Sequence, residues 1–108
     1  MSASYFGTNG IIFHEGRQVA LIKNFTVKVG RDGVIRIHIP VIENYSLDLL
    51  PCAFQTPLPS LLIHATINGQ RTRITEAKID RLTVSAKRNE VVLIKNVRML
   101  AVSIHWMY

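Results

Sequence analysis

The residues that could carry out chemistry in this chain are four histidines, seven acidic residues and one cysteine. Metal ligation needs several such groups close together, but the histidines stand singly, with no second histidine or cysteine two or four residues away; they are His14, His38, His64 and His105. A zinc site would therefore need several strands to converge. The serines and acids that could complete a hydrolytic triad have no supporting motif. We expect neither an enzyme nor a metal or cofactor site.

The single cysteine, Cys52, excludes an intrachain disulfide and is typical of a reducing compartment. It lies in an apolar segment rich in proline, which favours a packed thiol over a nucleophile. The N-terminal residues lack the basic and apolar regions of a signal peptide, and no apolar run reaches the ~20 residues needed to span a bilayer. We therefore expect synthesis in the cytoplasm and no membrane span.

Charge indicates an anionic partner. Thirteen Lys and Arg against seven Asp and Glu give a net charge of +6 and an isoelectric point near 10.0, in the range of nucleic-acid-binding domains. The basic residues are scattered, and only Arg71 with Arg73 and Lys87 with Arg88 are close together. Aromatic residues do not alternate with them as on a base-stacking surface. The positive charge therefore has two possible explanations: the basic side chains form an ordinary solvated surface, or the protein is a barrel that binds nucleic acid.

The fold is predicted from period-two alternation and from turn signals every eight to twelve residues. Both are typical of an all-β fold, an antiparallel sandwich or barrel of about six to eight strands, forming one domain over residues 1–108. At most one short helix is expected, over residues 43–50. Residues 51–59 are expected to be an apolar loop, because prolines remove backbone donors. The last strand is predicted to run over residues 97–106.

The clearest element is a hairpin over residues 25–39, in which apolar residues alternate with polar ones on both strands. A three-residue loop, residues 31–33, keeps the apolar side chains on one face, with Gly33 in the left-handed conformation that locks the register. This register sets Val29 opposite Ile35, Val27 opposite Ile37 and Phe25 opposite Ile39.

The same register sets Lys28 opposite Arg36 and Thr26 opposite His38. Like charges directly opposite repel. Either both side chains extend into water, or an acidic group from a neighbouring subunit or a phosphate lies between them. Lys28, Arg36 and His38 are therefore candidate contacts in an assembly.

Other turns follow from local sequence. Asn68 and Gly69 form the strongest signal for a two-residue type I′ hairpin, which sets Ile63 opposite Ile74. Residues 87–90 are expected to form a further turn. Residues 6–10 and 30–33 are glycine-containing but lack the strand-to-helix context of phosphate-binding loops, so both are expected to be turns.

Composition favours a protein that assembles. Hydrophobic residues make up 48% of the chain and charged residues 19%, below the usual ~25%. A domain this small has little interior, so part of its apolar surface is expected to be a subunit interface. The proline-stiffened segment would lose little entropy on docking, so its candidate contacts are Pro51, Phe54, Pro57 and Pro59. The alternative is a loop folded over its own core.

One resemblance covers residues 5–29. These begin with Tyr5-Phe6-Gly7, continue through a short apolar run to a Glu15-Gly16 turn, and then read Val-Ala-Leu-Ile-Lys-Asn-Phe-Thr. This pattern resembles the amino-terminal strands of tail tube proteins of tailed bacteriophages.

The resemblance implies a virion structural protein of the phage tail, present in the host cytoplasm before assembly. It implies a homo-oligomeric ring, a hexamer, that stacks into a conduit for DNA. Residues 25–29 and 34–39 would be barrel-forming strands. The implied partners are other copies of the chain, other phage structural proteins and DNA in the lumen. A related baseplate, neck or capsid-decoration protein remains open, as does a small basic β-barrel that binds nucleic acid.

Overall fold

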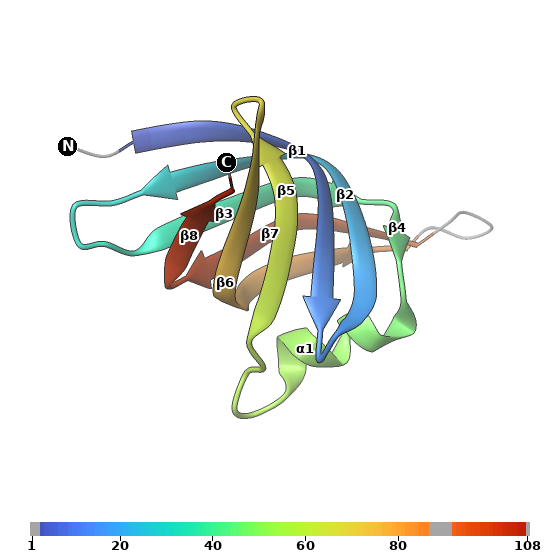
Figure 1. Cartoon of the computed structure of the whole chain (residues 1–108). Coiled ribbons are helices and arrows are strands. Elements are labelled where there is room, and N and C mark those ends of the chain that lie inside the picture. The colour runs from blue at the N-terminus through green and yellow to red at the C-terminus, as the bar shows by residue number, and fades with distance from the viewer. Residues whose placement is uncertain (1–2, 87–91, 108) are drawn as a thin grey trace.

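The computed structural model describes residues 3–86 and 92–107, which form an all-β fold with eight strands and one short α-helix (Figure 1). The predicted fold class is therefore confirmed. The strands are β1 (Ala3–His14), β2 (Arg17–Val29), β3 (Ile35–Ile42), β4 (Asn44–Tyr45), β5 (Leu61–Ile67), β6 (Gln70–Ser85), β7 (Leu93–Ala101) and β8 (Ser103–Trp106). A 3₁₀ turn, η1 (Leu47–Leu49), and helix α1 (Pro51–Phe54) connect β4 to β5.

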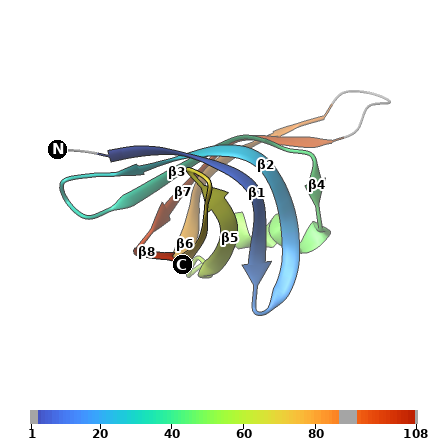
Figure 2. The same cartoon turned by 45° about the horizontal axis from the view of Figure 1, so that its top comes forward.

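Six strands close into an antiparallel barrel. The order around the barrel is β1-β5-β6-β7-β3-β2, and β2 pairs with β1 to complete the ring. The short strands β4 and β8 add to β2 and β6 respectively. Figure 2 shows how strongly β1 and β2 curve to make this closure. Closure pairs most of the sheet edges that would otherwise be free.

The interior of the barrel is filled by apolar side chains from all six strands. Its largest fully buried members are Phe25, Ile12, Ile37, Ile39, Ile42, Leu49, Leu61, Ile63, Ile67, Ile74, Ile94 and Met99. β5 and the first five residues of β3 bury alternate residues, so the residues between them point outward.

Residues 6–10, predicted to be a turn, instead lie inside β1, so this prediction is wrong. Gly7 is the cross-strand partner of Phe25 and Gly10 that of Ile22. Both glycines leave room for large β2 side chains, which a Cβ atom at either position would overlap. The pairing of β1 with β5 shifts nearby, and Asn9 has a φ of +50°. Glycine here serves close packing and a bulge rather than a chain reversal.

The hairpin of β2 and β3 has the predicted register. Val29 pairs with Ile35, Val27 with Ile37, Lys28 with Arg36 and Thr26 with His38. Gly33 has a φ of +80°, and its N–H donates to the carbonyl of Gly30 at 3.0 Å, as the three-residue loop requires.

The predicted pairing of Phe25 with Ile39 is wrong, because the ladder of β2 and β3 ends at Thr26 and His38. The next hydrogen-bonded pair would join Asn24 to Pro40, and proline has no N–H to donate. Phe25 and Ile39 remain buried in the core even though their backbones are not paired.

The hairpin of β5 and β6 is as predicted. Asn68 and Gly69 have φ values of +51° and +79°, as a type I′ turn requires, and Ile63 pairs with Ile74. The hairpin of β6 and β7 pairs Val84 with Ile94. The turn predicted at residues 87–90 lies outside the described residues.

Two predictions about residues 43–59 are wrong. Residues 43–50 do not form a helix of two turns: Asn44–Tyr45 is β4, and only Leu47–Leu49 is helical, capped by the Ser46 hydroxyl. Residues 51–54 are not loop but α1. Pro51 occupies the first turn of this helix, where its missing N–H would have no partner. Residues 55–60 have no regular structure.

The predicted last strand is divided. β7 ends at Ala101, Val102 forms a bend, and β8 begins at Ser103. β7 pairs with the second half of β6, whereas β8 pairs with its first half, Thr72 to Thr75. The bend also changes which residues face inward, so Leu100 and Val102 are exposed while Ile104 and Trp106 are half-buried against the core.

Candidate functional site

The outer surface of β2, β3, β7 and β6 gathers six of the chain's thirteen Lys and Arg residues. Across the first row, Lys28 lies opposite Arg36, Arg36 opposite Leu100, and Leu100 opposite Lys78. Cross-strand partners share one face of a sheet, so these side chains all point outward.

Two further rows continue this surface. Thr26 lies opposite His38, His38 opposite Arg98, and Arg98 opposite Arg81. Beyond them, Lys95 lies between Val41 and Thr83. We call this surface the basic face; its cations are Lys28, Arg36, Lys78, Arg81, Lys95 and Arg98.

Arg36 is neutralised within its own chain. Its Nη2 lies 3.1 Å from Oδ2 of Asp32, at the tip of the β2–β3 hairpin. The hydrogen bond from Arg36, followed by one from the Val34 N–H, lowers the pKa of Asp32 below its ordinary value, and the same pair raises the pKa of Arg36. The acid expected from a neighbouring subunit near Arg36 is therefore supplied by Asp32.

The other cations of the basic face have no such partner. Among the described residues, Lys28, Lys78, Arg81, Lys95 and Arg98 form no ion pair with an acid. Arg81 lies directly opposite Arg98, so this pair repels.

His38 lies half-buried in the middle of the basic face. Its Nε2 is buried and has no hydrogen-bond partner within the described part of the chain. The structure therefore brings together Lys28, Arg36 and His38, as the predicted register required, and adds four cations that the sequence left scattered.

A second candidate surface lies on η1 and α1, at the end of the barrel that appears lowest in Figure 1. Leu47, Pro51 and Phe54 are spaced four and three residues apart and all are exposed, Leu47 at 81% and Phe54 at 71%. This spacing places them along one side of the helical segment. We call these three residues the apolar ridge.

The other predicted contacts near the ridge differ in exposure. Pro57 is exposed, whereas Pro59 is half-buried. Cys52, on the inner side of α1, is 1% exposed, which confirms the predicted packed thiol. Burial, and then the charge of Asp48, raise the pKa of the thiol, so it is a weak nucleophile.

An apolar groove lies beneath the β2–β3 hairpin, on a different side of the molecule from the ridge. Its volume is about 390 Å³, and its lining includes Tyr5, Val29, Ile104 and Trp106. The rings of Tyr5 and Trp106 meet edge to face, with centroids 5.6 Å apart. We call this the hairpin groove.

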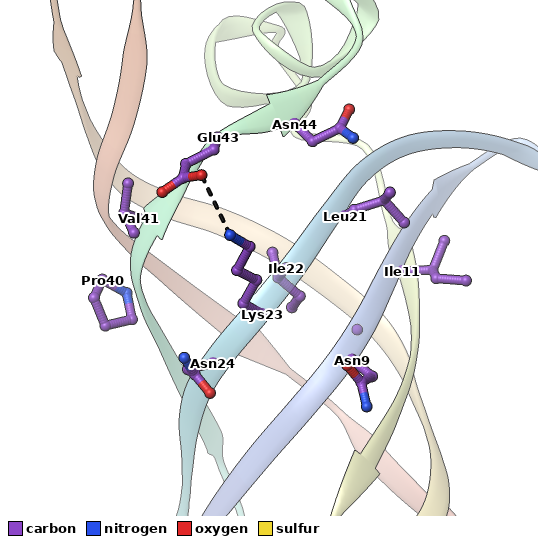
Figure 3. Close-up of a pocket in the computed structure, with 11 residues that line it drawn as sticks. Asn9, Ile11, Leu21, Ile22, Lys23, Asn24, Pro40, Val41, Glu43 and Asn44 are labelled. Carbon is purple, nitrogen blue, oxygen red and sulfur yellow. Dashed lines mark hydrogen bonds and ion pairs between the residues drawn. The ribbon is translucent and has the colours of Figure 1, made fainter.

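A larger pocket, about 720 Å³, opens where β2 and β3 separate at Pro40 (Figure 3). The Lys23 amine and the Glu43 carboxylate span its mouth at 3.5 Å. Its remaining polar groups are the amides of Asn9, Asn24 and Asn44, which can hydrogen-bond a ligand but do not supply a nucleophile or a general base.

The described residues contain no group of three or more His, Cys, Asp or Glu placed to hold a metal ion. In the same part of the chain, no helix has the length and apolar character needed to cross a membrane.

Sequence reasoning missed Leu47 and the β6 and β7 cations. Leu47 falls within the helix predicted over residues 43–50, where it shares a face with Tyr45 and Leu50, and its four-residue spacing from Pro51 is the signal that could have identified the ridge. Arg81 and Arg98 meet only through the pairing of β6 with β7, which local patterns do not specify.

Comparison with protein-family models, with curated proteins and with solved structures found no match for this chain.

Proposed function

We propose that this protein is a structural subunit that assembles with copies of itself, the apolar ridge of one copy packing into the hairpin groove of the next. The observation that carries this proposal is the exposure of Leu47 and Phe54 on a folded chain whose own core is already closed. Exposed large apolar side chains grouped on one element are typical of interaction surfaces.

The surface area agrees with this proposal. A folded monomer of 12.2 kDa is expected to expose roughly 6,100 Å², whereas this chain exposes 6925 Å². The difference of roughly 800 Å² is similar to what one partner buries in an interface of standard size. Part of it comes from the β2–β3 hairpin and the start of β1, which extend beyond the barrel (Figure 1).

The apolar ridge and the hairpin groove have different shapes, one convex and one concave, and their positions limit the ways in which copies can assemble. The ridge and the groove lie on different sides of the molecule, so one pair of copies does not make both contacts at once and the contact is head-to-tail rather than two-fold symmetric. Head-to-tail contacts produce rings when the rotation closes and open filaments when it does not.

The resemblance of residues 5–29 to phage tail tube proteins makes this assembly more specific. These residues form most of β1 and β2, which are two strands of the barrel, and β2 is also one strand of the projecting hairpin. By that resemblance the ring is a hexamer that stacks into a DNA conduit of the virion tail. A baseplate, neck or capsid-decoration protein would need the same lateral contact but not the stacking.

Negative-stain electron microscopy of the purified protein at micromolar concentration tests this proposal. Rings that stack into tubes support a tail tube subunit. Rings that remain single support the assembly contact but point to a neck or decoration role. A field without particles larger than the monomer would refute self-assembly.

A further inference from the structure

We propose that the basic face binds the phosphate backbone of nucleic acid without reading its sequence. This site is separate from the apolar ridge and the hairpin groove, so the inference does not depend on assembly.

The dimensions of the face suit this ligand. It spans four neighbouring strands, β2, β3, β7 and β6. Adjacent strands lie about 4.8 Å apart, so the face is roughly 14 Å across. Duplex DNA carries one phosphate per strand for each ~3.4 Å of axis, and although each strand winds away from a flat surface, a face of this width meets several phosphates at once.

The charges of the face are available to a ligand. Six basic side chains stand against three acidic ones, Asp32, Asp80 and Glu76, which is beside Lys78 at the border of the face, for a net charge of +3. Of these six basic side chains, Arg36 alone is in an ion pair with an acid of the described part of the chain. The repulsion between Arg81 and Arg98 would be relieved by a phosphate between their side chains, whereas folding alone gains nothing from it.

Hydroxyl groups lie among these cations. Thr26 is in the row of Arg81 and Arg98, and Thr83 lies opposite Lys95. Threonine hydroxyls donate hydrogen bonds to phosphate oxygens in protein–DNA contacts, which hold the protein on the duplex and carry no sequence information.

A second copy of the chain is a poor partner for this face. Glu43 already forms an ion pair with Lys23, and Glu15 is on the β1–β2 turn, where its Oε1 lies 3.8 Å from Nε2 of His14. Glu76 borders the face itself, beside Lys78, and Asp48 is on η1, so the described acids do not form an acidic surface complementary to the face. An acidic protein from another source would bind here without any affinity for DNA, and the experiment below separates the two.

Fluorescence anisotropy with a labelled duplex of about 20 base pairs, measured at a series of salt concentrations, tests the inference. If the five unpaired cations each neutralise a phosphate, the logarithm of the association constant should fall with the logarithm of salt with a slope of about −4.5. Affinity should then drop about 500-fold between about 50 and 200 mM salt. A duplex of unrelated sequence should give the same values.

Paired variants locate the site. Arg81→Gln/Arg98→Gln should reduce the slope to about −2.7, because two phosphate contacts are lost. Lys28→Gln/Lys78→Gln should do the same, and provides the test if the first variant does not fold. Arg71→Gln/Arg73→Gln is the matched control: it removes the same charge from the other half of β6, where these residues face β5 and β8, and should leave the slope near −4.5.

Three results would overturn the inference. One is a slope shallower than about −1 for the unmodified protein, which indicates no phosphate contacts. Another is an equal effect of the control and the two face variants, which indicates attraction by net charge alone. The third is a folded protein that does not bind the duplex at low salt, which leaves an acidic protein as the partner.

Discussion

The aromatic ring of Phe25 lies against Gly7, its cross-strand partner on β1, so closely that a Cβ atom at position 7 would overlap three atoms of the ring. Phe25 is the largest fully buried side chain of the barrel. The glycine is therefore required by packing: β1 and β2 can curve around one large side chain only because the other strand has none at that point.

Replacing Gly7 with alanine should destabilise the fold by about 1–3 kcal/mol, since the Phe25 ring must move in a core that is already filled. The free energy of unfolding in urea measures this. Ser4→Ala is the control, because Ser4 is on the same strand but exposed. Equal stability of the Gly7 variant and the Ser4 variant would show that the ring has space to move.

Gly33 is needed for a different reason. Its φ is +80°, and no atom lies within 4 Å of the place a Cβ would take, so the cost of a side chain there is purely conformational. Gly33→Val should cost on the order of 1–3 kcal/mol, and Gly33→Asn clearly less, because asparagine tolerates the left-handed conformation. Subunit association should fail first in the valine variant, since the hairpin forms one wall of the proposed groove. Equal losses for valine and asparagine would contradict this explanation.

The Asp32 carboxylate should contribute to stability in a pH-dependent way. Its pKa is lowered below 3.8 in the folded state, chiefly by Arg36 and then by the Val34 N–H. Its contribution is therefore complete above the unfolded pKa and is lost as the pH falls through the lowered folded value. Asp32→Asn keeps an acceptor for Val34 but loses the charge, so this variant should be less stable than the unmodified protein near pH 7, and the difference should disappear as the pH falls below the lowered folded pKa of Asp32. A stability difference that does not change with pH would show that the ion pair contributes nothing.

The apolar ridge, rather than Arg36, is expected to control assembly, because Arg36 already has an acidic partner in its own chain. Phe54→Ser should weaken association at least tenfold, about 1.4 kcal/mol, as loss of a central aromatic contact does. Arg36→Gln should leave association unchanged. If Arg36→Gln weakened assembly as much as Phe54→Ser, an acid from a neighbouring subunit at Arg36 would again be the better explanation.

Local sequence was sufficient for the hairpins. The chemistry of Gly33, and of Asn68 with Gly69, specifies turns whose register follows from which side chains must be buried together. These signals are short-range, so they do not require knowledge of the rest of the fold.

Barrel closure and the basic face could not be predicted in this way. β1 joins β5, and β3 joins β7, through pairings between residues far apart in the sequence. No turn specifies them, so Arg98 could not be placed between His38 and Arg81 from local patterns. The helical start at Pro51 was missed because proline was considered only as a breaker of regular structure, although it is favoured at the first position of a helix.

The most direct test of self-assembly is the mass of the unmodified protein in solution at micromolar concentration, measured by light scattering beside Phe54→Ser. We expect a large oligomer for the unmodified protein, with a mass that is a multiple of 12.2 kDa, and a species closer to the monomer for the variant. A single monodisperse species of one chain for the unmodified protein would contradict it.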